Sequence, residues 1–247
     1  MNYLDKLVNS LQKSPLSIVE FNKILSKSDT FFDNIELEKE LLISNGLPLY
    51  FSDDYVMLKT STNHIEDQTF CIVDIETTAG NAKDGQIIEI GAVKYKNGQV
   101  IEHYDSLVNT GAIPWKIQEL TGITPEMTHS APNLRSVLEE FKIFLEDDLF
   151  VAHAINFDYK FVSDSFMKYD LGQLCNRRLC TIELAKKVIK CERYGLKYLK
   201  ENLNIDIDNH HRAFSDALST QKILEICIDK LPKEIVTTED LIQFTKQ

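Results

Sequence analysis

The segment FCIVDIETT, residues 70–78, decides how this chain folds, because its apolar run predicts a buried central strand. Side chains alternate between the two faces of a strand, so Asp74 and Glu76 point to the same face. Two buried carboxylates this close together repel each other, and the pair is costly without a cation. Oxygen ligands of this kind suit Mg²⁺ or Mn²⁺. Alone the pair is a weak signal, since such triplets in acidic proteins usually lie on solvated faces.

A second candidate carboxylate follows another short apolar stretch. HAINFDYKF, residues 153–161, comes directly after LFVA, which predicts a further buried strand. Asp158 lies at the expected start of a helix, where an N-cap role explains its carboxylate equally well. His153 is of a type that is more often a hydrogen-bonded structural residue than a ligand.

The third candidate element is HHRAFSDALST, residues 210–220, in which His211 and Asp216 flank the expected start of a helix. The helix dipole alone favours an acid in the first turn. The same two residues also fit a general base placed above a metal-binding carboxylate. The local sequence does not decide between these interpretations.

The segments around these motifs predict an α/β domain with a mixed sheet. IIEIGAVKYKNGQVIEHYDSLV, residues 87–108, contains Asn97-Gly98 between two strand-like runs, which is a strong hairpin signal. Helical periodicity or helix-forming composition predicts helices over residues 133–146, 158–169, 181–190, 196–203 and 213–229. Pro232 marks a break after the last of them.

Taken together and in this order, the three motifs resemble the DEDD exonuclease superfamily in its histidine-containing subgroup. The first motif corresponds to residues 74–78, the second to residues 153–158, and the third to His211-Arg212-Ala213 with Asp216-Ala217. The resemblance covers about residues 70–231. The stretches LTGITPEM and VAH are also similar to those of the proofreading epsilon subunits of bacterial DNA polymerase III. Chance agreement across three spaced motifs is much rarer than agreement at one.

Two positions depart from the family pattern. The second motif usually has Asn directly after its His, where this chain has Ala154, with Asn156 two residues further on. The usual Gly after Thr-Thr is replaced by Ala79, with Gly80 following. Both departures fall near the expected substrate contacts and leave the metal ligands unchanged.

The resemblance implies a ribonuclease-H-like fold, with a mixed five-stranded sheet flanked by helices. It also implies a two-metal site in which carboxylates hold two Mg²⁺ or Mn²⁺ ions. The implied ligands and base are Asp74, Glu76, Asp158 and Asp216, with His211 taking the proton from the attacking water. Thr77 and Phe157 are the implied contacts to the last nucleotide, although core packing explains Phe157 equally well.

The activity implied by the resemblance is a 3′→5′ exonuclease that releases nucleoside 5′-monophosphates from unpaired DNA 3′ ends, in proofreading or repair. A DNA polymerase subunit is a further partner that the resemblance suggests. An RNA-trimming exonuclease is the nearest alternative, because the catalytic motifs do not reveal the sugar. A non-catalytic interaction module with the same fold is the other, and the complete acidic set with His211 argues against it.

Three parts are expected along the chain: an accessory domain over residues 1–64, the exonuclease domain over 68–231, and a tail over 232–247. The accessory part reads as three helices and a hairpin, which resembles a winged-helix domain. Its third helix is acidic, with Glu36, Glu38 and Glu40. This charge favours a protein-interaction or structural role over the binding of duplex DNA. Both this part and the tail are expected to face partners.

The bulk composition places few limits on the function. The chain has 247 residues, of which 43% are hydrophobic, and lacks both a run long enough to span a membrane and a signal-like start, which predicts a cytoplasmic protein. Its five cysteines form no C-x-x-C pair and are expected to be reduced thiols.

The net charge of −11 is unusual for a nucleic-acid partner, but the positive charge is concentrated. Residues 177–200 hold eight Lys and Arg against two Glu, which gives +6 and leaves −17 elsewhere. This basic stretch supports either a nucleic-acid strand or only a solvated helix face. Tyr194 and Tyr198 within it are candidates for base stacking, or equally for packing.

Overall fold

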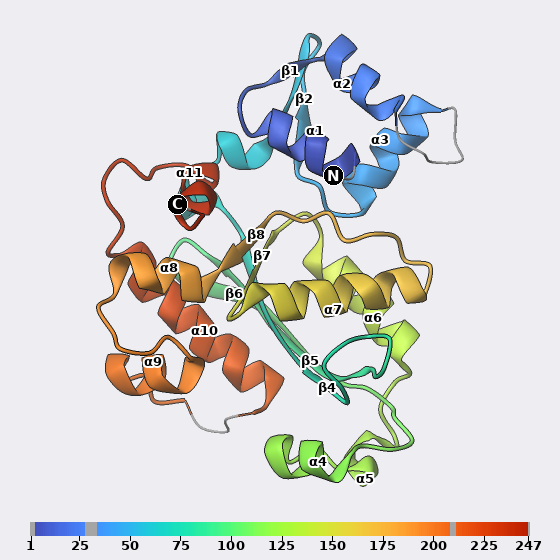
Figure 1. The fold of residues 1–247 in the computed structure, drawn as a ribbon, viewed down its shortest axis with the longest axis vertical. Coiled ribbons are helices and arrows are strands. Elements are labelled where there is room, and N and C mark those ends of the chain that lie inside the picture. Colours follow the sequence, from blue (N-terminus) through green and yellow to red (C-terminus); the bar gives the residue numbers. More distant parts are fainter. Residues whose placement is uncertain (1–2, 28–33, 208–210, 247) are drawn as a thin grey trace.

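A mixed five-stranded sheet organises the larger part of the chain (Figure 1). The computed structural model describes residues 3–27, 34–207 and 211–246. The strand order is β6-β5-β4-β7-β8, with β4 in the centre. β4 pairs antiparallel with β5 and parallel with β7, which confirms the predicted mixed sheet. The strands are β4 Phe70–Thr77, β5 Ile87–Lys96, β6 Gln99–Leu107, β7 Leu149–Ala152 and β8 Arg178–Cys180.

The predicted hairpin joins β5 to β6. Asn97 and Gly98 both have positive φ, at 47° and 76°, and Lys96 pairs with Gln99 across the turn. A two-residue turn with two positive φ angles matches the right-handed twist of the strands that it connects. Asn and Gly tolerate this conformation best, so the local sequence accounts for the turn.

Helices cover both faces of the sheet (Figure 1). One face carries α6 Leu134–Leu145 and α7 Ile155–Lys168, and the other carries α8 Thr181–Val188, α9 Leu196–Leu203 and α10 Ala213–Ile228. Successive residues of β4 alternate between the two cores. Cys71, Val73 and Ile75 lie in the α6–α7 core, whereas Phe70 and Ile72 lie in the α8–α10 core.

The N-terminal part has its own small core. Its elements are α1 Tyr3–Leu11, β1 Leu16–Ser17, α2 Ile18–Leu25, α3 Ile35–Ser44, β2 Leu49–Phe51 and β3 Tyr55–Leu58. The strands form a second sheet in the order β1-β3-β2. Gly46, with φ 90°, directly follows the C-cap residue of α3, Asn45. The assignment of this part to the winged-helix fold stays a prediction.

Polar contacts fix the N-terminal part to the part that contains the five-stranded sheet. The Cys175 N–H donates to the Asn45 carbonyl at 2.8 Å, and Lys142 Nζ donates to Asn45 Oδ1 at 2.9 Å. Gly46 leaves room for Asn176, because a Cβ at Gly46 would lie 2.0 Å from Asn176 Oδ1. The two parts therefore contact each other at Asn45 and Gly46, which directly follow α3.

The C-terminal segment, which the sequence predicts to be a tail, is integrated into the fold. It forms α11 Thr238–Phe244, and Leu241 and Ile242 are buried in the α8–α10 core. Glu239 is buried as well and pairs with Arg177, with Nη2 to Oε1 at 2.5 Å, and it accepts from Thr60 Oγ1 at 2.8 Å. Buried apolar side chains of this helix are unavailable to an external protein. Within the described ranges, none of the helices is long and apolar enough to cross a membrane.

Candidate functional site

Asp74 and Glu76 lie near the end of β4 on the face that carries α10. They share this face with Phe70 and Ile72, because alternate strand residues point the same way. Glu76 lies opposite Glu89 of β5 in the strand register, and Asp74 lies opposite Gly91. Apolar core residues thus occupy one half of this face of β4, and carboxylates occupy the other half.

Asp158 comes to the same place from α7. It is only 4% exposed and lies in the first turn of the helix. The N-cap of α7 is Ala154, so the N-cap explanation for Asp158 is wrong. Hydrogen bonds with the backbone of Asp158 itself and of Ile75 place its carboxylate beside β4.

His211 and Asp216 come from the start of α10, whose first turn contains Asp216. The His211 N–H donates to Asp216 Oδ2 at 3.1 Å, and Asp216 is 5% exposed. Ligand atoms of Glu76, His211 and Asp216 all lie within 4.8 Å of one another. Three segments that are far apart in the sequence therefore meet at one point.

The pKa values show how strongly these carboxylates interact. Burial, followed by repulsion from Asp158 and Asp216, raises the pKa of Asp74 well above its usual range. Burial and the charges of Glu89 and Asp216 raise the pKa of Glu76 to about 7. Burial raises the pKa of Asp158 to about 8. Clustered carboxylates of this kind fit a divalent cation, whose positive charge stabilises their ionised forms.

We expect the metal-free protein to lose stability as the pH rises from about 4 to about 8. In the folded chain the pKa values of Glu76 and Asp158 are about 7 and about 8, against usual values of 4.5 and 3.8. The folded state thus keeps protons that the unfolded chain has already lost, so raising the pH favours unfolding. Urea unfolding midpoints measured in a chelator at pH 5 and pH 8 test this expectation.

The matched substitutions for this pH test lie on one helix. Asp158→Asn removes one titrating group and should make the loss of stability shallower. Asp164→Asn, at a half-exposed position of α7 in an ion pair with Lys160, should leave the slope unchanged. A midpoint that rises between pH 5 and pH 8 without metal would contradict the burial of these carboxylates.

The remaining predicted residues lie around the cluster in different roles. His153 is structural, because its ring nitrogens lie 2.8 Å from Thr181 Oγ1 and 2.9 Å from the Tyr194 carbonyl. Burial lowers the pKa of His153 to about 4, despite the Tyr194 carbonyl. Thr77 is buried and donates to the Ala79 carbonyl at 2.8 Å. Phe157 is 40% exposed, so core packing alone does not account for it.

Ala154, the first departure from the family pattern, has a left-handed backbone with φ 72° and ψ 51°. This conformation is costly for Ala and easier for Asn, because the Asn side chain hydrogen-bonds locally. We expect Ala154→Asn to raise the free energy of unfolding by about 1 kcal/mol. Urea denaturation measures the change. Asn204→Ala, at the left-handed C-cap of α9, should lower the free energy of unfolding. Changes in the same direction at both positions would contradict the argument.

Two of the eight basic side chains in residues 177–200 are buried and do not contribute to a basic surface. Arg177 and Lys200 are buried, the first against Glu239 and the second with its Nζ donating to the Ile207 carbonyl. Tyr194 is packed, with its hydroxyl donating to the Ile189 carbonyl. Tyr198 is exposed under the Arg193 guanidinium, which lies 4.8 Å from the ring centre, so it stays available for stacking.

The sequence did not predict the ion pair between two residues beside the cluster. Glu89 is fully buried on β5 and pairs with Arg212, with Arg212 Nη2 2.6 Å from Glu89 Oε1. The available signal was the charge itself, since Glu89 interrupts an apolar strand as Asp74 and Glu76 do. The pairing of Glu89 with Arg212 could not be predicted from the sequence, because 123 residues separate them.

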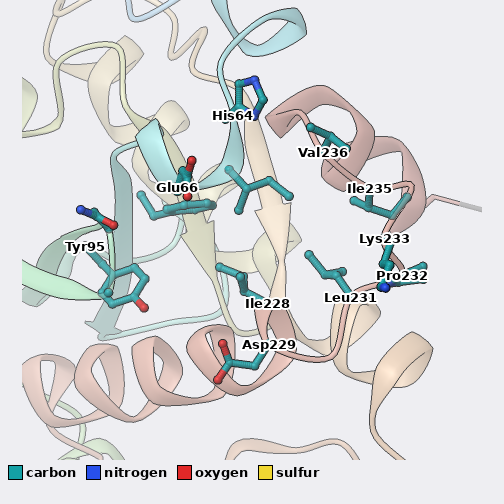
Figure 2. A pocket seen from close by; sticks show the side chains of 14 residues that line it. His64, Glu66, Tyr95, Ile228, Asp229, Leu231, Pro232, Lys233, Ile235 and Val236 are labelled. Atoms are coloured by element: carbon teal, nitrogen blue, oxygen red, sulfur yellow. The ribbon is translucent and has the colours of Figure 1, made fainter.

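A separate cleft of ≈470 Å³ lies at the opposite end of the sheet. Figure 2 shows Tyr95, Ile228 and Leu231 among the side chains around it. Phe70, at the start of β4, and the turn Asn97-Gly98 also line it. The cleft contains none of the carboxylates described above, so it is distinct from the candidate site.

Comparisons with known proteins match the part of the chain that carries the site. The exonuclease family model (RNase_T) matches residues 71–224. The DNA polymerase III epsilon subunit of Aquifex aeolicus is 33% identical over 171 residues, which are 68% of this chain and 85% of that protein. The PolC-type DNA polymerase III of Clostridium perfringens is 36% identical over 172 residues. That match covers 68% of this chain but only 12% of the length of the PolC-type protein.

Solved structures show the same fold at lower identity. Exonuclease I of E. coli in complex with single-stranded DNA has a TM-score of 0.62 and 16% identity, over 68% of this chain and 42% of that chain. Exonuclease X in complex with 5′-overhanging duplex DNA has a TM-score of 0.58 and 21% identity, over 71% of this chain and 99% of that chain.

Proposed function

Since this chain belongs to the exonuclease family, we propose that it hydrolyses nucleic acid from 3′ ends, with DNA as the substrate, in proofreading or repair. The observation that carries the proposal is the convergence of Asp74, Glu76, Asp158 and Asp216 from three separate segments beside His211. Similarity to a polymerase epsilon subunit over 85% of that protein supports DNA rather than RNA.

The four carboxylates are the residues that would hold two divalent ions, Mg²⁺ or Mn²⁺. When bound, such ions activate water and stabilise the charge on the attacking and leaving oxygens. His211, at the exposed side of the cluster, takes the proton from the attacking water. Water forms the new bond to phosphorus while the bond to the 3′ oxygen breaks, which releases a nucleoside 5′-monophosphate.

Thr77 and Phe157 are the proposed contacts to the last nucleotide of the substrate. They lie next to the proposed ligands Glu76 and Asp158 in the sequence. The exposed ring of Phe157 offers a stacking surface for the last base. A base can reach such a ring only when it is unpaired, which favours frayed and mismatched ends.

A DNA polymerase subunit is the proposed partner. The matched segment forms a small part of the PolC-type relatives, which are polymerases by name. A chain that carries the nuclease part would then act beside a polymerase, with residues 1–64 as the proposed contact. Co-elution of the purified chain with the replicative polymerase of its own organism, lost when residues 1–64 are removed, tests this proposal.

The nuclease proposal is tested with end-labelled primers, paired or 3′-mismatched, in DNA and RNA versions, with Mg²⁺ or with EDTA. We expect Mg²⁺-dependent loss of 3′ nucleotides from DNA, faster at mismatched ends. Trimming of RNA alone would reassign the chain to RNA processing. Absence of activity on both by the folded protein would leave a non-catalytic interaction module.

A further inference from the structure

A fully buried carboxylate holds the turn that carries His211. Both oxygens of Glu89 are used: Oε1 accepts from Arg212 Nε at 2.9 Å and from Arg212 Nη2 at 2.6 Å. Oε2 accepts from the Ala213 N–H at 2.8 Å. The donors are thus the two residues that directly follow His211 in the chain. A carboxylate suits this position because its two oxygens match both the guanidinium fork and a backbone N–H.

The backbone of His211 needs such support. Its φ of 65° is in the left-handed region, which costs free energy for a residue other than glycine. Such conformations persist when the surrounding contacts fix them. On one side, the His211 N–H donates to Asp216 Oδ2 at 3.1 Å, and on the other, Arg212 and Ala213 are bound to Glu89.

The strand beneath this turn is shaped to receive it. Gly91 lies two residues after Glu89 on β5, and a Cβ there would lie 2.1 Å from the Phe214 nitrogen. The start of α10 therefore rests directly on β5. Glu89 and Gly91 point to the same face of the strand, so one provides the hydrogen bonds and the other the space.

We propose that Glu89 is a positioning residue for His211, acting through Arg212 and the Ala213 N–H. The inference rests on the proposed function, in which His211 is the proton acceptor. Glu89 does not reach the substrate, because it is fully buried. It sets the orientation of the peptide that carries the His211 ring toward the carboxylates of Glu76 and Asp216.

The first experiment is a pair of matched substitutions at two buried glutamates that each pair with an arginine. Glu89→Gln keeps the shape but turns an amide N–H toward one of its donors, and we expect kcat to fall about 10–100-fold. KM and the Mn²⁺ concentration for half-maximal activity should stay within about twofold. Glu239→Gln disrupts the equivalent pair with Arg177 away from the site and should lower the unfolding midpoint without changing kcat. A raised Mn²⁺ requirement in Glu89→Gln with an unchanged kcat would overturn the proposal, because the charge of Glu89 beside Glu76 would then account for the whole effect.

A double-mutant cycle separates positioning from general damage to the fold. If Glu89 acts through His211, adding Glu89→Gln to His211→Ala should slow the enzyme no further. Multiplying effects would overturn this inference while leaving the proposed function intact. If His211→Ala alone has the wild-type rate, both this inference and the role of His211 as base fail. Arg212→Gln, at a side chain that is 35% exposed, is the second variant for the same cycle should Glu89→Gln not fold.

Discussion

Asp158→Ala is expected to reduce nuclease activity to below about one-thousandth while the protein stays folded. Asp158 is 4% exposed and stands among carboxylates that raise one another's pKa, so it is a proposed ligand without a substitute nearby on α7. Removing it also removes repulsion that destabilises the metal-free fold. Activity on a mismatched DNA primer and far-ultraviolet circular dichroism measure the two effects.

The matched control for this prediction is Asp164→Ala. Asp164 lies on the same helix, is half-exposed, and pairs with Lys160 in a surface ion pair of little energetic weight. Its loss should leave both activity and fold unchanged. Full activity in Asp158→Ala would remove Asp158 from the ligand set, and loss of the dichroism signal would make its inactivity uninformative about ligands.

The local sequence predicted those features that depend on local physics. The apolar run of residues 70–73 predicted a buried strand, and Asn97-Gly98 predicted a hairpin, because backbone conformation and burial act within a few residues. The same-face placement of Asp74 and Glu76 followed from strand periodicity alone. Whether the pair faced a solvated surface or a cluster required Asp158 and Asp216, whose proximity depends on the folded chain.

Long-range pairing limited the rest of the prediction. Charge along residues 177–200 does not reveal that Arg177 is neutralised by Glu239, which lies 62 positions later. The same pair, with Leu241 and Ile242, converts an expected tail into part of the core. Glu89 was overlooked for the same reason: strand register places it opposite Glu76, and register is set by pairing between strands. The resemblance to a family assigned roles to residues of the three motifs. It did not identify the residues that hold those motifs in position, such as Glu89.

His211→Ala is expected to slow turnover by roughly 10²–10⁴ without weakening metal binding, because general-base catalysis contributes an amount of this order. Among the clustered residues His211 is the exposed one, whereas Asp216 is buried, so the histidine is the group that a water molecule can reach. The four carboxylates stay in place in this variant. Single-turnover rates on mismatched DNA, together with Mn²⁺ titration by calorimetry, measure the rate and the binding separately.

The control for His211→Ala is His103→Ala. His103 is exposed on β6 and its ring lies 5.5 Å from that of Phe214, near the same end of α10 but outside the carboxylate cluster. Loss of this histidine should not change the rate. Free imidazole should restore part of the activity of His211→Ala, since it supplies the missing proton acceptor, and should have no effect on Asp158→Ala. An unchanged rate in His211→Ala would exclude His211 as the base and leave the carboxylates as the proposed catalytic groups, whereas a slow variant with weakened Mn²⁺ binding would make His211 a ligand instead.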